Sequence, residues 1–347
     1  MENSIPDLPT ELVIEILSRL PVKSLLKFRC ASKSWFALIS SPEFVKTHLS
    51  LNANNNEYTR HKVMMLERIV CSFRDCSGSS LCNNSCIEAN DLDYHRQVPY
   101  LCLYGSWVNE LILWNPSIRK YKKLPSPKTN TTWGYRVYSF GYDEFHDDYK
   151  VVVLWNDNFS LQIEAQKYSL KGDSWRTVDN CPSMERLSQS GSIISIDLAD
   201  RKWGEMGLPC YWKGGRGVVL SLGSDLFFCD CDETYMVDVW LMKEYGVKDS
   251  WMKMFTIKIP QDPSVYGYLG QIRLHMASGS EILVVFGSTF MIYNLKGDLL
   301  RSSKAINSNN WAEAEIYIES LVCPFSTVGT EDATKMGLKS LGCETMK

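Results

Sequence analysis

The feature that most constrains this 347-residue chain is a change of hydrophobic period after about residue 50. Before that point, apolar residues recur at helical spacing. Beyond about residue 100, short runs rich in β-branched and aromatic residues alternate with turn signals. Because one segment cannot satisfy both periods, the sequence predicts an α+β multidomain chain, with a small helical unit followed by an all-β domain.

Proline residues divide the N-terminal unit into short helices. Pro9 suits the first turn of a helix, and Pro21 ends that helix because it cannot donate a backbone hydrogen bond. Ser41 followed by Pro42 is a second helix-start signal. The sequence therefore predicts helices over 12–20, 22–29 and 31–39, and a fourth that begins near Pro42.

This helical unit is too small to be stable alone. Its first helix gathers Leu12, Val13, Ile16, Leu17 and Leu20 on one face. Burying so few side chains recovers little beside the conformational entropy lost when about 45 residues become ordered. We therefore interpret the apolar face as a surface that binds a partner, with packing among the helices as the alternative.

Weak internal repetition marks the β domain. An apolar strand, a short polar turn and a strand that opens with an aromatic residue or Leu recur, with starts at 114, 168, 196, 240 and 293. Known propeller blades take about 40–50 residues, so spacings of 54, 44 and 53 residues favour a kelch-like propeller. The remaining spacing, of 28 residues, indicates either that a blade is incomplete there or that the assignment of the repeat is partly wrong. Tryptophans in such strands are interpreted as core anchors.

Charge and hydropathy exclude several classes of function. A formal net charge of -3, without a basic patch, gives no nucleic-acid footprint. The longest apolar runs are strand-sized and too short to span a membrane. Residues 1–7 lack the basic and apolar regions of a secretory signal, so we expect a cytoplasmic and/or nuclear protein.

No arrangement of side chains indicates catalysis or a cofactor. The five histidines form no pattern with Ser, Cys or acidic residues, and no known catalytic motif is visible. The cysteine run at 71, 76, 82 and 86 lacks paired zinc knuckles, so a reduced surface loop is favoured over a zinc site. The acidic segment 143–148 is interpreted as a solvated turn in preference to a calcium loop, and the lysines at 120–123 as a solvated rim.

Residues 8–35, LPTELVIEILSRLPVKSLLKFRCASKSW, closely resemble the F-box of plant F-box proteins. The following domain resembles the plant F-box-associated domain, type 1, in segments such as LWNPSIRKYKKLP at 113–125 and FGYDEFHDDYKVVV at 140–153. In sequence, these segments most resemble those of the S-locus F-box and S-locus F-box-like proteins. The expected domains are an F-box at 1–50, a polar linker with an irregular entry segment at 51–99, the F-box-associated β domain at 100–324 and a loose tail at 325–347.

The resemblance implies a non-catalytic substrate receptor of a cullin-type ubiquitin ligase. The F-box would bind a Skp-family adaptor and, through it, a cullin and a RING protein, while the β domain would hold a target protein. For an S-locus protein the target would be a pistil ribonuclease. The residues expected to contact the adaptor are Leu8, Pro9, Leu12, Ile16, Leu20, Pro21, Val22, Leu25 and Trp35.

The chain departs from the family pattern in two places. Residues 100–107 hold only part of a glycine-containing family segment, and 181–191 replace a usual NGxLHW-type strand. The second departure coincides with the 28-residue spacing. An adaptor-binding decoy, or a diverged paralogue with an impaired target domain, therefore stays open, as does a sugar-recognising or kelch-like enzyme domain.

Overall fold

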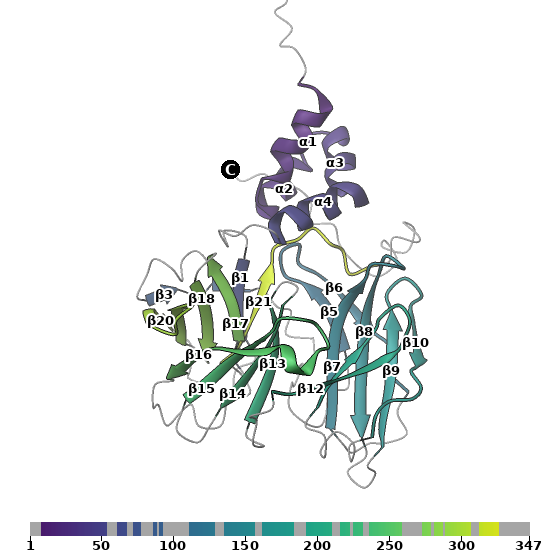
Figure 1. The fold of residues 1–347 in the computed structure, drawn as a ribbon. Coiled ribbons are helices and arrows are strands. Elements are labelled where there is room, and N and C mark those ends of the chain that lie inside the picture. The colour runs from purple at the N-terminus through teal and green to yellow at the C-terminus, as the bar shows by residue number, and fades with distance from the viewer. Residues whose placement is uncertain are drawn as a thin grey trace, which may run out of the picture.

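In the computed structural model, four helices stand at one end of a ring of β-sheets (Figure 1). The structure describes these residues: 8–53, 61–67, 72–77, 86–88, 90–92, 111–128, 135–156, 162–183, 192–209, 216–222, 225–231, 236–258, 273–278, 281–286, 289–306 and 312–325. No helix among them is both long and apolar enough to cross a membrane. The segments 100–107 and 184–191, and the expected tail beyond residue 325, lie outside the described residues.

Each of the four helices begins within two residues of its predicted start. Pro9 and Pro21 each stand directly before a helix, and Ser32 caps the third helix by accepting a hydrogen bond from the Trp35 backbone at 3.1 Å. Ser41 accepts one from the Phe44 backbone at 3.2 Å. The predicted helices are confirmed as α1 (Thr10–Ser18), α2 (Val22–Phe28), α3 (Lys33–Ser40) and α4 (Pro42–Ala53).

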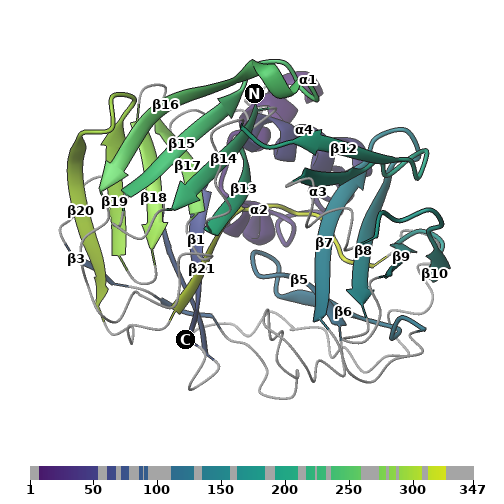
Figure 2. The same cartoon turned by 60° about the horizontal axis from the view of Figure 1, so that its bottom comes forward.

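The β-region forms a propeller-like ring. Four of its sheets have four or five strands, and two further sheets have two described strands each. Figure 2 shows the sheets following one another around the ring in chain order. The strands β13, β17 and β21 each stand at one end of their sheet and lie against one another.

The strands are grouped by sheet in the order of the chain. The first sheet contains β1 (His61–Glu67), β2 (Ser72–Ser77), β4 (Asn90–Asp91) and β21 (Ala312–Ile318); the second contains β5 (Leu111–Asn115) and β6 (Lys120–Leu124). The third contains β7 (Tyr135–Asp143), β8 (Asp148–Asn156), β9 (Ile163–Ser169) and β10 (Ser174–Thr177); the fourth contains β11 (Ser192–Ile196) and β12 (Trp203–Gly207). The fifth contains β13 (Arg216–Leu222), β14 (Asp225–Cys231), β15 (Met236–Met242) and β16 (Trp251–Lys258), with a 3-10 turn η1 (Lys248–Ser250) before β16. The sixth contains β17 (Arg273–Ser278), β18 (Glu281–Phe286), β19 (Thr289–Asn294), β20 (Leu299–Ile306) and β3 (Cys86–Glu88).

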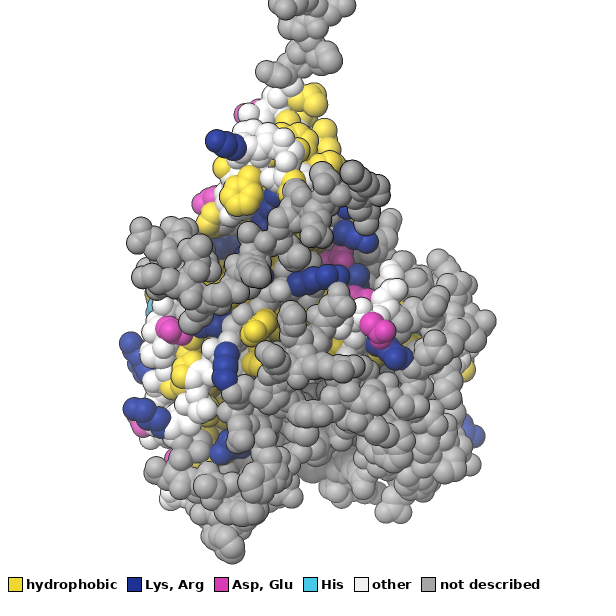
Figure 3. Space-filling model, turned by 180° about the vertical axis from the view of Figure 1, so that it is seen from behind, with side chains coloured by type: hydrophobic (Ala, Val, Ile, Leu, Met, Phe, Trp, Pro, Cys, Tyr) yellow, Lys and Arg dark blue, Asp and Glu magenta, His cyan; other side chains and the backbone are white. Residues whose placement is uncertain are grey.

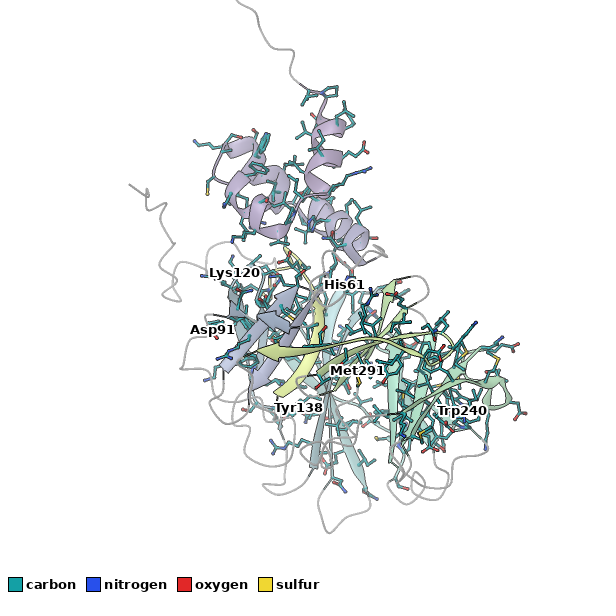
Figure 4. All side chains as sticks on the ribbon, turned by 90° about the vertical axis from the view of Figure 1, so that its left-hand side faces the viewer. His61, Asp91, Lys120, Tyr138, Trp240 and Met291 are labelled. Carbon is teal, nitrogen blue, oxygen red and sulfur yellow. The ribbon has the colours of Figure 1, made fainter. Side chains whose placement is uncertain are left out.

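The ring is closed by strands from opposite ends of the chain. Strand β21 pairs antiparallel with β1, from His61↔Ile318 to Glu67↔Ala312. Strand β3 leaves the first sheet and pairs in parallel with β20 on the edge of the sixth. Figure 4 places His61 at the end of the ring nearest the helices, close below α4. The first strand of the ring, β1, and its last strand, β21, therefore belong to the same sheet.

The prediction of a linker over 51–99 is wrong for the residues that form β1, β2, β3 and β4. Strands β1 and β2 bury side chains that a solvated linker would leave exposed. Val63 and Met65 of β1 are buried, as are Asp75 and Cys76 of β2. The pairing of β1 with β21 cannot be recognised from local sequence, because the two strands lie more than 200 residues apart in the chain.

The sequence repeat corresponds to one structural unit, the hairpin formed by the last two strands of a sheet. The five repeat starts lie in β5, β9, β11, β15 and β19, and each of these strands pairs with the next one in the chain. The 28-residue spacing joins a start in the third sheet to one in the fourth, whose two described strands are β11 and β12. The second sheet also has two described strands, so the number of described strands does not set the short spacing apart.

Repeat tryptophans connect neighbouring sheets. At or just after the start of a sheet's outer strand, an indole N–H donates to a backbone carbonyl of the preceding sheet. Trp175 donates to Pro125 O at 2.6 Å, Trp203 to Asp179 O at 2.9 Å and Trp251 to Gly207 O at 2.8 Å. Three positions in the repeat thus fasten one blade to the next.

Candidate functional site

A stripe of exposed apolar side chains lies on α1 and the residue before its cap. Leu8, Leu12 and Ile16 are spaced by four residues, so they share one helical face, and their exposed fractions are 60%, 45% and 52%. We call these three residues the α1 stripe. Seen from behind in Figure 3, apolar atoms gather on the helical end of the molecule.

The opposite face of α1 is already occupied, so the stripe is not unfinished core. Leu17 is 2% exposed and packs in the core of the helical unit, with Val13 partly buried against it. The polar side of α1 carries Glu15, which accepts from Arg19 at 2.8 Å over one helical turn. Since the inward positions are filled, the stripe is a surface that a second molecule can cover.

The structure separates the nine residues expected to contact the adaptor. Leu8, Pro9, Leu12 and Ile16 are exposed, and Leu20, Pro21 and Trp35 are partly buried. Val22 and Leu25 are 1% and 0% exposed and pack with Leu17, Ile39 and Phe44. For Val22 and Leu25 the structure corrects the expected surface position, because their face of α2 is turned into the helical core.

Two exposed aromatic residues were not among the expected contacts. Phe36 of α3 is 56% exposed, and Phe28 at the end of α2 is 36% exposed and lies edge-on to Trp35 with ring centroids 5.4 Å apart. The signal was present in the sequence. Ile39 takes the buried side of α3, and Trp35 lies one turn before it, so the adjacent Phe36 must point elsewhere.

The helical unit is fixed to the ring by an ion-pair network. Lys46 of α4 pairs with Asp147 in the β7–β8 turn, and Lys171 of the β9–β10 turn pairs with the same carboxylate at 3.0 Å. Hydrogen bonds from Lys46, Tyr142 and Lys171 hold the pKa of Asp147 well below its usual range. Asp147 therefore remains charged at neutral pH and links α4 to the third sheet.

Glu144 is exposed, as expected of a solvated turn, but Asp143 and Asp148 are buried. The side chains of Asp143 and Asp148 are 1% and 2% exposed, and Lys150 pairs with Asp148 and lies 3.9 Å from Asp143. Burial acts to raise the pKa of Asp148, but hydrogen bonds from Lys150 and Ser169 outweigh it and lower the pKa. These carboxylates serve as internal ties of the third sheet.

The basic run on β6 also differs in part from a solvated rim. Lys122 donates to Asp173 at 2.7 Å and lies over the Tyr168 ring, 5.8 Å from its centroid. Lys120 and Lys123 are exposed, and Figure 4 shows Lys120 at the helical end of the ring. Lys122 thus connects the second sheet to the third.

Within the described ranges, no group of three or more His, Cys, Asp or Glu side chains is arranged to hold a metal ion. Of the cysteine run, Cys71 and Cys82 lie outside those ranges. Cys76 is buried in β2, where desolvation raises the pKa of its thiol to about 12. Cys86 belongs to β3, on the edge of the sixth sheet.

Comparison with known proteins matches both parts of the chain. An F-box domain model matches residues 5–47, and a model described as the F-box associated beta propeller domain, in its FBA_3 form, matches residues 43–197. An F-box/kelch-repeat protein of Arabidopsis thaliana is 29% identical over 92% of this chain and 96% of its own length. The F-box protein CPR1 of Arabidopsis thaliana is 24% identical over 91% of this chain and 88% of its own length. Among solved structures, TolB from Acinetobacter baumannii aligns with a TM-score of 0.39 and 10% identity over 79% of this chain and 70% of that chain, too weak a likeness to support an argument.

Four helices with an exposed apolar stripe, followed by a propeller-like ring of β-sheets, define a two-part architecture in the described residues. With both domain models matched in order, the chain is an F-box protein of the plant kind with an F-box-associated domain. The matched domain model is the FBA_3 form, whereas the sequence motifs resemble type 1.

Proposed function

We propose that this protein is a substrate receptor of an SCF-type ubiquitin ligase, in which the α1 stripe binds the Skp-family adaptor. The observation that carries the proposal is that Leu8, Leu12 and Ile16 are exposed while the inward face of α1 is full. Exposed apolar stripes of this kind are typical of helices that dock against a partner. The adaptor would connect the chain to a cullin and a RING protein.

In this role the chain contributes position and no covalent chemistry. The F-box-associated ring would hold a target protein beside a ubiquitin-conjugating enzyme carried by the cullin. Tethering raises the effective concentration of a target lysine at the ubiquitin thioester, which accelerates transfer without a nucleophile from the receptor. The fixed attachment of the helical unit through Lys46 and Asp147 suits this role.

The test is adaptor binding by the full chain and by a Leu12→Ala/Ile16→Ala variant. Each side chain contributes about 1.5–3 kcal/mol when fully buried, so the pair should weaken the adaptor Kd by roughly 100-fold or more. Leu51→Ala on α4 is the matched control, because Leu51 is 49% exposed and lies outside the stripe. Failure of the folded, unmutated chain to bind a plant Skp-family adaptor would overturn the proposal.

The target is the narrower part of the proposal. The motif resemblance to S-locus proteins supports a pistil ribonuclease as the target and a cytoplasmic and/or nuclear location. To test this assignment, the full-length protein is immobilised and the binding of each member of a panel of purified pistil ribonucleases is measured. Binding to none of them would leave a general plant substrate receptor and remove the S-locus role.

An adaptor-binding decoy is the alternative, and it is supported by the 28-residue repeat spacing that coincides with the departure from the family pattern at 181–191. A decoy would bind the adaptor but would recruit no target. Co-purified ubiquitylated proteins, enriched over those recovered with the Leu12→Ala/Ile16→Ala variant, would support a receptor. Equal recovery with both proteins would support the decoy.

A further inference from the structure

The core of the helical unit contains a residue from the far end of the chain. Leu321 is 3% exposed and packs in the same cluster as Leu17, Val22 and Leu25. Nearly 270 residues separate it from the end of α4. The helical unit therefore does not complete its core with its own four helices.

The second sheet holds this segment in place. The Asn115 side chain at the end of β5 donates to Ser320 O at 3.0 Å and to Val322 O at 2.8 Å. Those two carbonyls flank Leu321, so the asparagine fixes the backbone on both sides of the buried side chain. Ile118, in the β5–β6 turn, is partly buried against the same helical cluster.

The buried leucine directly follows the strand that closes the ring. Strand β21 ends at Ile318, and its last pair is with His61, the first residue of β1. Glu319 accepts from Lys62 of β1 at 3.1 Å, so the backbone leaves the closed blade in a defined position two residues before Leu321. Leu321 thus lies three residues beyond the strand that closes the ring.

We propose that residues 319–325 form a strap that makes the adaptor-binding form of the helical unit conditional on closure of the β-ring. With the ring open, the helices lack Leu321 and the support of Asn115, and α1 no longer presents the stripe on a rigid base. The adaptor would then discriminate between closed and unclosed copies of the chain. This consequence for the adaptor rests on the proposed function, whereas the coupling between strap and helices does not.

The experiment compares hydrogen exchange in the full-length protein and in Leu321→Ala. Amides of α1 to α4 are expected to exchange at least about tenfold faster in the variant, because opening of the helical unit becomes easier. Amides of β14 and β15, in the fifth sheet, should keep their wild-type rates. Leu321→Met, which retains apolar volume, should restore slow exchange in the helices, and Leu295→Ala, at a 41% exposed turn position, is the matched control.

Adaptor binding supplies the second readout. The Kd should weaken at least about tenfold in Leu321→Ala and stay within about threefold in Leu321→Met. If Leu321→Ala yields no folded protein, Asn115→Ala tests the same coupling with a milder change, and its helices should also exchange faster than those of the wild type.

Unchanged exchange in α1 to α4 of the variant would overturn the coupling. Equal acceleration in helices and blades would also overturn it, because Leu321 would then support the whole ring and not the helical unit. An unmutated chain that binds no adaptor removes the proposed function, yet the exchange comparison still decides whether the strap completes the helices.

Discussion

At the scale of single residues, the tryptophans show how a repeat becomes a ring. A strand hairpin has no intrinsic reason to sit beside the next one, but an indole N–H at the same repeat position reaches a carbonyl of the preceding sheet in three successive cases. The donor is the indole of a tryptophan that recurs in the repeat, and the acceptor is a backbone carbonyl, which every residue has. The contact therefore tolerates variation in the neighbouring sequence. This explains why the tryptophans recur while the residues around them differ.

Replacing Trp251 by Phe should lower the free energy of unfolding by about 1 kcal/mol, the typical net value of one hydrogen bond. The ring contact with Phe228 can persist in part, whereas the donation to Gly207 O at 2.8 Å is lost. Chemical denaturation measures the change. Tyr245→Phe, at a 70% exposed position before η1, is the control and should change stability by less than about 0.5 kcal/mol. Equal effects of both substitutions would contradict the role of the indole.

Thiol reactivity should separate Cys30 from Cys76. The thiolate is the reactive form, and burial raises the pKa of Cys76 to about 12, so this thiol stays protonated at pH 8 and gains reactivity only as pH rises toward that value. Cys30 is exposed. Iodoacetamide labelling followed by peptide mass spectrometry should find Cys30 modified and Cys76 protected in the folded protein, with both modified in denaturant. Rapid labelling of folded Cys76 would contradict the buried position of β2.

At the scale of elements, the helices were predictable and the first blade was not. Proline and serine signals indicated the starts of α1, α2 and α4, because those signals act over a few residues, whereas the Ser32 cap of α3 was not predicted. Strands β1 and β2 were mistaken for a linker. They pair with each other, but the second partner of β1 is β21, which comes from the end of the domain. The same limit applies to Val22 and Leu25, whose apolar character fits both an interface and a core until the arrangement of α2 against α3 and α4 is known.

The two faces of the helical unit should respond differently to truncation. Leu25→Ala removes a side chain that is 0% exposed and should cost about 2–5 kcal/mol of stability. Leu12→Ala, at 45% exposure, should cost under about 1 kcal/mol while still weakening adaptor binding. Denaturation of the two variants gives the comparison. A Leu12 variant as unstable as the Leu25 variant would place the α1 stripe in the core.

Closure of the ring depends on a polar contact among β1, β2 and the end of β21. Lys62 donates to Asp75 at 3.0 Å and to Glu319 at 3.1 Å, and the Tyr317 hydroxyl donates to Asp75 at 2.7 Å. Lys62→Ala leaves two carboxylates without their cation and should destabilise the domain by about 3 kcal/mol. Thermal unfolding measures the loss. Lys253→Ala, in an exposed pair with Asp238, is the control, and an equal loss there would contradict the special role of the closing blade.

At the scale of the whole molecule, the helical unit and the ring form one connected body. Lys46 and Asp147 join α4 to the third sheet, and Leu321 joins the closing strand to the helical core. A docking stripe held at a fixed position relative to the blades is what a receptor acting by proximity requires. The sequence alone separates these parts into two domains, because the residues that connect them are distant in the chain and ordinary in type.

The most direct test of this account is the hydrogen-exchange footprint of a Skp-family adaptor on the full chain. The account predicts that binding slows exchange in the first turns of α1 and around the α1 stripe, while β14 and β15, away from the closing blade, keep the rates of the free protein. Protection confined to the β-ring, or no protection under saturating adaptor, would contradict it.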